Sequence, residues 1–166
     1  MSLPPEFSRR IPVDGIGPDG LVQTVTAEPA ECEALALRLG VPAVLKLAAT
    51  FRLHRGEAGR VEATASLTGR LVRDCVVSLE PFETDIGETF SIAFVPEAGL
   101  GTAIDLDGVD EVPYTGGAID LGEATAEQVA LTLDPYPRCP GVALPDAATE
   151  GQDSPFAALA QRLRTH

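Results

Sequence analysis

The sequence has few of the residues on which enzyme and metal chemistry depend. Its 166 residues include three cysteines, two histidines, one methionine and no tryptophan. Cys32, Cys75 and Cys139 are odd in number and far apart, which argues against a disulfide framework and for a reducing compartment. No apolar run approaches the roughly eighteen residues of a membrane helix, and the first residues lack the basic-then-apolar pattern of a secretion signal. We therefore expect a cytoplasmic protein without a membrane segment.

Catalysis that depends on histidine has little support. His166 is the last residue, and His54 has no serine or cysteine nearby in the sequence. The motifs G-x-S-x-G, H-E-x-x-H and the phosphate-binding loop are all missing. An enzyme would instead need converging carboxylates, such as Glu80, Glu83 and Asp85. We expect no enzyme, no catalytic residue, no cofactor and no small-molecule substrate.

The charge of the chain is divided unevenly. The net charge is −13; residues 1–73 carry a net +1 and residues 74–166 carry a net −14. The acidic half either keeps the protein soluble or attracts a basic protein. Any contact with RNA should therefore come from the first half.

Hydrophobic periodicity predicts an α+β fold with a mainly antiparallel, meander- or barrel-like sheet and two principal helices. The expected strands cover residues 7–13, 21–27, 45–53, 61–70, 86–94 and 112–114, with a bend or bulge over 72–79 and an acidic loop over 96–111. One helix should begin near Pro29 and end at Gly40. The second should begin at the capping pair of Asp120 and Glu123 and run to Leu131 or Leu133.

The clearest local signal is a hairpin with alternating apolar and polar residues. Odd positions from Leu45 to Leu53 and from Val61 to Leu67 are apolar, and most even positions are polar. Opposed residues of an antiparallel pair share a face, so we expect Val61 opposite Leu53 and Arg60 opposite His54. This register gathers basic side chains on one outer face: Lys46, Arg52, His54, Arg60 and Arg70. They either form the wet side of the sheet or bind phosphates, with Arg73 beside them.

We expect one domain over residues 1–139. A segment rich in proline, glycine and alanine follows over 140–153 and reads as a flexible linker. Residues 154–166 predict a short amphipathic helix whose apolar face includes Phe156 and Leu159.

The acidic segment near residue 105 invites a calcium interpretation. Asp105, Asp107, Asp110 and Glu111 lie close together, and calcium prefers clustered oxygen ligands. The glycine comes too early for a helix–loop–helix calcium site, and the distal glutamate is misplaced. We therefore expect an acidic loop without a metal.

Several short motifs resemble one known family. The stretch from Arg73 to Glu83, RDCVVSLEPFE, resembles the central motif of the YceD-like family, the large ribosomal RNA subunit accumulation proteins, which in many members reads R-C-x-R-C-L-x-P-F. The matching positions here are Cys75, Leu79, Glu80, Pro81 and Phe82. Asp120 and Leu121, the LTLDPYPR segment at 131–138 and PFAAL at 155–159 also look like family landmarks.

The resemblance also raises the question of zinc, since members with four cysteines are suspected of binding it. Here Ser78 stands where a second cysteine of the motif would be, and only Cys139 remains downstream. Two cysteines cannot close a structural zinc site. We therefore expect a metal-free form in which Cys75, Val77 and Leu79 pack beneath a turn made by Glu80 and Pro81.

The resemblance implies a non-catalytic cytoplasmic factor that supports accumulation of large-subunit (23S) ribosomal RNA. Its partner would be ribosomal RNA or a ribosomal or RNA-processing protein. Direct RNA contact would use the basic face, although no aromatic side chains for base stacking accompany it. The alternative is an acidic adaptor that binds only protein, through Asp105, Asp107, Asp110 and Glu111 or through the helix with Phe156 and Leu159.

Overall fold

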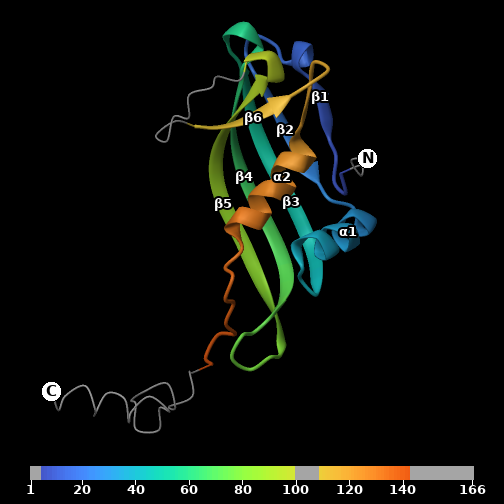
Figure 1. Cartoon of the computed structure of the whole chain (residues 1–166), viewed down its shortest axis with the longest axis vertical. Helices are drawn as coiled ribbons and strands as arrows, with labels where there is room; N and C mark the ends of the chain where they lie inside the picture. Colours follow the sequence, from blue (N-terminus) through green and yellow to red (C-terminus); the bar gives the residue numbers. More distant parts are fainter. Residues whose placement is uncertain (1–4, 100–108, 143–166) are drawn as a thin grey trace, which may run out of the picture.

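The chain folds into one long five-stranded sheet with two helices and a small second sheet (Figure 1). The computed structural model describes residues 5–99 and 109–142. The elements are β1 (Arg10–Pro12), β2 (Leu21–Thr26), α1 (Pro29–Leu39), β3 (Ala43–Arg55), β4 (Val61–Asp74), β5 (Pro81–Pro96), β6 (Asp110–Tyr114), β7 (Ala118–Asp120) and α2 (Leu121–Thr132), with 3-10 turns at Val13–Gly15, Glu57–Gly59 and Glu97–Gly99.

The five-stranded sheet follows the order β2-β3-β4-β5-β6, and β1 pairs with β7 in the two-stranded sheet. All pairs are antiparallel except β5 with β6, which is parallel. The predicted α+β class with a mainly antiparallel sheet is therefore confirmed. The first and last strands do not pair, so the sheet is not closed into a barrel. No helix in the described ranges is long and apolar enough to cross a membrane.

The predicted hairpin forms, but its register differs by two residues. Leu53 pairs with Ala63 and His54 with Glu62, so the expected pairings of Val61 with Leu53 and Arg60 with His54 are wrong. The turn keeps the expected five residues but lies one position further along the chain, at residues 56–60, because Arg55 still pairs with Val61. A 3-10 turn fills it, in which Ala58 has a φ of 52°. Odd positions still face odd positions, and β4 buries Val61, Ala63, Ala65 and Leu67.

The start of β3 and the first strand also depart from the predicted pattern. Leu45 is 49% exposed, because the register shifts between Val44 and Lys46 and turns its side chain out of the core. The first strand covers only Arg10–Pro12 instead of residues 7–13, although Phe7 is fully buried.

The link between β4 and β5 is shorter than the predicted bend over 72–79. Ladder pairing continues until Asp74 meets Pro81, so the turn is confined to Cys75–Glu80. The predicted packing around Cys75 is wrong for Leu79, whose side chain is 79% exposed and whose φ is 61°. Pro81 belongs to β5 rather than to the turn. Cys75 alone is fully buried there.

Both helices form where local signals predict them. In α1, Pro29 occupies the first turn, the Glu28 N–H donates to the Glu31 carboxylate at 2.8 Å, and Gly40 adopts a φ of 64° beyond the last residue. In α2, the Asp120 side chain accepts the N–H groups of Gly122 and Glu123. These caps satisfy backbone groups that the helix termini leave unpaired.

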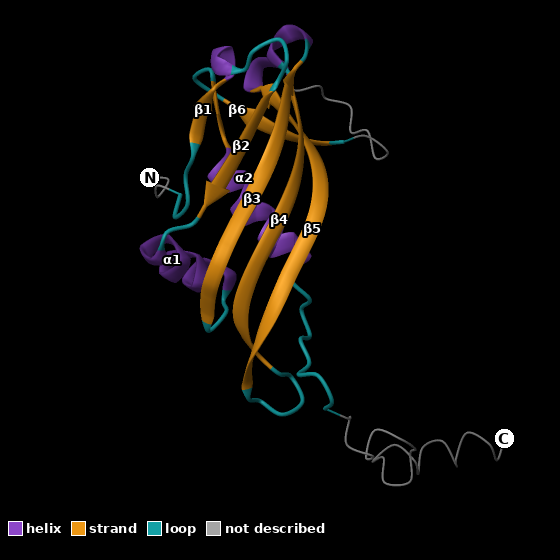
Figure 2. Ribbon diagram, turned by 180° about the vertical axis from the view of Figure 1, so that it is seen from behind, coloured by secondary structure: helices purple, strands orange, loops and turns teal. Residues whose placement is uncertain are grey.

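The core lies on one face of the sheet only. The inward side chains of β3 and β4 pack with α1, α2 and the N-terminal segment in a single cluster that includes Leu35, Phe51, Leu67, Ile119 and Val129. Figure 2 shows the opposite face of β2 to β5 without a helix in front of it. That uncovered face, called the open face below, carries the even-numbered side chains of β3 and β4.

Candidate functional site

The open face carries four of the six predicted basic side chains. Lys46, Arg52, His54 and Arg70 are all exposed on it, as predicted from their shared parity. Arg70 is the neighbour of Lys46 across β3 and β4, but its guanidinium also holds Asp85 of β5 through two hydrogen bonds of 2.7 and 3.1 Å. This partner raises the pKa of Arg70 and lowers the pKa of Asp85. Lys46 and Arg52 have no ion pair within the described ranges.

The other two predicted basic residues do not lie on this face. Arg60 follows the 3-10 turn, and its guanidinium pairs with Glu111 of β6. Arg73 donates to the carbonyl oxygen of Asp134, beyond the end of α2. Both arginines are held by residues that are far away in the sequence, and the alternation of the hairpin does not indicate such partners. The surface that remains is polar rather than strongly basic, with hydroxyl groups aligned across the strands: Thr24, Thr50, Thr64, Ser66, Thr68, Thr89 and Ser91.

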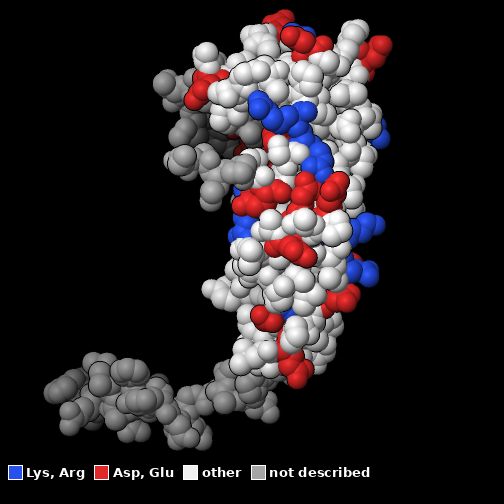
Figure 3. All heavy atoms as spheres, turned by 90° about the vertical axis from the view of Figure 1, so that its right-hand side faces the viewer, with Lys and Arg blue, Asp and Glu red and all other residues white. Residues whose placement is uncertain are grey.

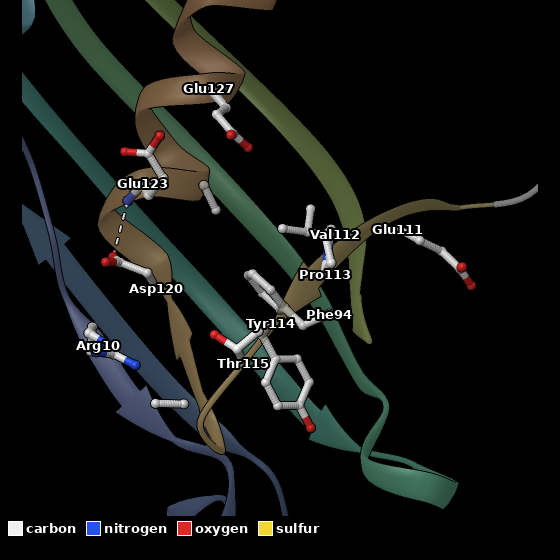
Figure 4. A pocket seen from close by; sticks show the side chains of 12 residues that line it. Arg10, Phe94, Glu111, Val112, Pro113, Tyr114, Thr115, Asp120, Glu123 and Glu127 are labelled. Atoms are coloured by element: carbon white, nitrogen blue, oxygen red, sulfur yellow. Dashed lines mark hydrogen bonds between the residues drawn. The ribbon is translucent and has the colours of Figure 1, made fainter. Parts of the chain in front are cut away.

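A concavity lies between β6 and α2. It consists of two adjoining hollows of about 390 and 350 Å³, which share Glu111, Val112, Ala124 and Glu127. We call this pair of hollows the cleft. Figure 4 shows Glu123 and Glu127 projecting from α2 on one side and Val112 and Tyr114 of β6 on the other. Apolar side chains line it as well: Ile92, Phe94, Val112, Pro113, Ala118, Ala124 and Leu131.

The cleft is predominantly acidic. Its lining contains five carboxylates and one guanidinium: Asp110, Glu111, Asp120, Glu123, Glu127 and Arg10. Residues outside the lining neutralise two of the carboxylates. Arg60 pairs with Glu111, and Arg38 pairs with Glu123 at 2.7 Å. Figure 3 shows such acidic and basic side chains next to one another on the side of the molecule that carries α1.

Asp110 and Glu127 are the lining carboxylates that are most available to a binding partner. Both side chains are exposed, and neither forms an ion pair within the part of the chain that the structure describes. Asp120 is different because its carboxylate already accepts four hydrogen bonds, from Ser8, Arg9, Gly122 and Glu123. The cleft therefore offers apolar contact area together with carboxylates that still lack a cationic partner.

The predicted acidic loop contributes only in part. Asp110 and Glu111 belong to strand β6 rather than to a loop, and they line the cleft. Asp105 and Asp107 lie outside the described residues, as do Phe156, Leu159 and the predicted terminal helix over 154–166. Most of the predicted linker over 140–153 lies there too, so the domain boundary at 139 stays a prediction.

The tip of the β4–β5 hairpin forms a second local arrangement. We use the word tip for residues 75–80. The Sγ of Cys75 accepts the N–H of Ser78 at 3.4 Å and the N–H of Cys139 at 3.3 Å. The Cys139 N–H, followed by the hydroxyl and N–H of Ser78, lowers the pKa of Cys75 to about 6. Cys75 and Cys139 are therefore neighbours, although 64 positions separate them.

A metal site does not fit these residues. Within the described ranges, no three His, Cys, Asp or Glu side chains converge in a way that could hold a metal ion. Ser78 occupies the remaining motif position, and a serine hydroxyl is a poor zinc ligand at neutral pH. Backbone N–H groups already surround the Cys75 sulfur. We assign no metal to the tip.

Comparison with known proteins decides the family. The family described as large ribosomal RNA subunit accumulation protein YceD matches residues 63–161, more than half of the chain. The chain belongs to the YceD family. No curated protein and no solved structure matches the chain.

The region matched to the YceD family runs from within β4 to beyond α2 and therefore includes the tip and most of the cleft lining. It includes the cleft residues Glu111, Glu123 and Glu127, and both Cys75 and Cys139 of the tip. It begins after β3, so Lys46 and Arg52 of the open face lie outside it. The YceD family is not known for catalysis, and its name links it to ribosomal RNA accumulation.

The sequence prediction missed the acidic residues of α2. Glu123 and Glu127 are four positions apart and therefore lie one helical turn apart on the same side of α2. That spacing was visible in the sequence. What it could not reveal is that β6 runs opposite α2, because the two elements meet only through the tertiary fold.

Proposed function

We propose that the protein is a non-catalytic factor in large-subunit ribosomal RNA accumulation that binds a ribosomal or RNA-processing protein through the cleft. The observation that carries this proposal is the combination of apolar lining with two carboxylates, Asp110 and Glu127, that have no ion pair among the described residues. Such a surface complements a protein segment with lysine or arginine beside aliphatic side chains. Ribosomal proteins, which bind phosphates with basic residues, supply segments of this chemistry.

Edge strand β6 adds a second means of recognition. It is the last strand of the sheet order, so one of its edges has no neighbouring strand within the described residues. An extended segment can add to such an edge through main-chain hydrogen bonds, while pockets select its side chains. The adjoining carboxylates would then select for basic side chains.

Direct RNA binding is the second candidate, and one observation favours it. Lys46 and Arg52 are exposed on the open face without carboxylate partners among the described residues, next to a row of hydroxyl groups. Lys46 and Arg70 also line a hollow of about 430 Å³, and Asp85 lies in the same lining. Lys46 and Arg52 alone provide little attraction for a polyanion on a chain of net charge −13, so we rank this route second.

The test is gradient co-sedimentation of the tagged protein from growing cells at low and moderate salt. We expect the wild type to migrate with large-subunit precursors and Glu127→Lys to remain at the top of the gradient. Glu33→Lys is the matched control, because it makes the same charge change at an exposed position of α1 outside the cleft. It should migrate like the wild type.

Two outcomes would overturn the proposed site or the proposed role. Loss of migration in a Lys46→Glu/Arg52→Glu variant, with Glu127→Lys unaffected, would move the contact to the open face. A wild-type protein that stays at the top in every condition would exclude stable binding to ribosomal particles. The level of large-subunit ribosomal RNA in cells lacking the protein tests the role separately from the site.

A further inference from the structure

Cys75 and Cys139 lie within reach of a covalent bond. The nitrogen of Cys139 is 3.3 Å from the Cys75 sulfur. One further backbone bond of about 1.5 Å leads to the Cys139 Cα, which therefore lies within about 4.8 Å of that sulfur. Disulfides join Cα atoms that are about 4.4–6.8 Å apart, and the Cys75 sulfur is two bonds from its own Cα, so this sulfur–Cα distance is compatible with a Cα–Cα separation in that range.

The segment that precedes Cys139 is held against the tip and the adjoining end of β4. The Val76 N–H donates to the Pro137 carbonyl oxygen at 2.9 Å, and the Arg73 guanidinium donates to the carbonyl oxygen of Asp134. In Figure 1 the orange-red segment after α2 runs down beside β5 to the loop that joins β4 and β5. Three contacts thus position Cys139, and its approach to Cys75 does not depend on a single hydrogen bond.

The two sulfurs differ in access. Cys75 is fully buried, whereas Cys139 is partly exposed. The N–H groups around the Cys75 sulfur stabilise its thiolate, which is the nucleophilic form in disulfide chemistry. Cys32, in α1, provides the contrast: burial raises the pKa of its thiol, and its Sγ lies 3.9 Å from a carbonyl oxygen. Cys32 therefore has the properties of an inert core thiol.

We propose that Cys75 and Cys139 form a reversible disulfide, with a small disulfide of the oxidised-glutathione type as the oxidant. The accessible Cys139 thiolate attacks one sulfur of the small disulfide, forming a mixed disulfide and releasing one small thiolate. The Cys75 thiolate then attacks the Cys139 sulfur, breaks the mixed disulfide and releases the second small thiolate. The two cysteines lose two electrons in total, and the small disulfide takes up both.

The bond would tie the segment after α2 covalently to the tip. Without it, that connection consists of the three hydrogen bonds described above. The site is separate from the cleft, whose lining contains no cysteine within the described ranges. Failure of the cleft in the co-sedimentation test would therefore leave the disulfide proposal intact.

The experiment equilibrates the reduced full chain with oxidised and reduced glutathione, quenches free thiols and digests with trypsin without reduction. Trypsin cuts after Arg73 and Arg138 and places the two cysteines on separate peptides, residues 74–138 and 139–162. Mass spectrometry should find these peptides linked, at least about tenfold above any linkage to Cys32. Cys32→Ser should leave the yield unchanged.

Single variants test the order of the two steps. Cys75→Ser should accumulate glutathione on Cys139, because no thiolate is present to resolve the mixed disulfide. Cys139→Ser should leave Cys75 unmodified, because its sulfur is buried. The proposal is overturned if the wild type retains glutathione on Cys139 without linkage, or if neither cysteine reacts. Glutathione on Cys75 in the Cys139→Ser variant would contradict the proposed point of entry.

Discussion

Removing the Asp120 carboxylate should destabilise the fold far more than the loss of one helix cap. The Asp120 Oδ1 accepts the N–H of Arg9 at 2.8 Å and the N–H groups of Gly122 and Glu123 at 3.0 and 3.2 Å. Its Oδ2 accepts the hydroxyl of Ser8. One side chain thus caps α2 and fastens the N-terminal segment to it. Asp120→Ala removes both connections.

The magnitude follows from these contacts. Loss of an N-cap costs about 1 kcal/mol, with a range of about 0.5–2 kcal/mol. A hydrogen bond to a charged group, here from the Arg9 N–H, contributes about 1.5–3 kcal/mol. Asp120→Ala should therefore lower the free energy of unfolding by about 2–4 kcal/mol. Asp120→Asn should cost less than about 1 kcal/mol, because asparagine caps helices as well as aspartate does.

Urea unfolding followed by far-ultraviolet circular dichroism measures these differences. Ser8→Ala serves as a further comparison, since it removes one donor and leaves the cap in place. The order of stability should be wild type, Asp120→Asn and Asp120→Ala. The reasoning fails if Asp120→Asn costs as much as Asp120→Ala, or if the alanine variant loses less than about 1 kcal/mol.

Three further predictions concern glycine, cysteine and arginine. Gly122→Ala would place its Cβ 2.6 Å from a backbone oxygen of the N-terminal segment and should cost about 1–3 kcal/mol in urea unfolding, whereas Gly17→Ala meets open space and should stay within about 0.5 kcal/mol of the wild type. The pKa of Cys75 is about 6 in the folded state, against about 8.5 for an ordinary thiol, so its thiolate should stabilise the fold increasingly from pH 6 to about 8.5, and this gain should be lost as the pH falls through 6. The Tm difference between the wild type and Cys75→Ala, measured under reducing conditions, should grow over that range; a constant difference would contradict the thiolate. Arg70→Ala should leave the urea midpoint unchanged, because the ion pair of Arg70 with Asp85 is exposed to solvent. A clear shift of the midpoint would contradict this and show that the ion pair stabilises the fold.

Elements that depend on neighbouring residues could be predicted from the sequence. Pro29 is the first residue of α1 and Gly40 follows its last residue, as their residue types predict, and alternation over Leu47 to Leu53 identifies β3 and its inward face. The predicted hairpin register was wrong by two residues, because the turn lies at residues 56–60 and includes a positive φ at Ala58, which an alanine does not indicate. Local patterns therefore predicted the elements and their faces, but not the position of the turn.

The candidate site depends on contacts that no local pattern contains. Glu111 could be identified as acidic, yet its pairing with Arg60 and its place opposite α2 come from the sheet order. Cys139 lies 64 positions after Cys75, and only the tertiary fold brings the two residues together. For the same reason, the sequence wrongly placed Arg60 on the predicted phosphate-binding face, whereas Arg60 pairs with Glu111. Charge type could be predicted from the sequence, whereas charge neutralisation could not.

The pairing of β1 with β7 has a consequence for synthesis of the chain. The backbone of Arg9 binds the side chain of Asp120, 111 positions later. At about 5–20 residues per second, a ribosome needs about 6–22 s to make the residues between them. For that interval β1 has no partner strand and Phe7 has only part of its final surroundings. The N-terminal segment therefore lacks these contacts until α2 has been synthesised. Formation of the contact between Arg9 and Asp120 is expected to be a late event in folding.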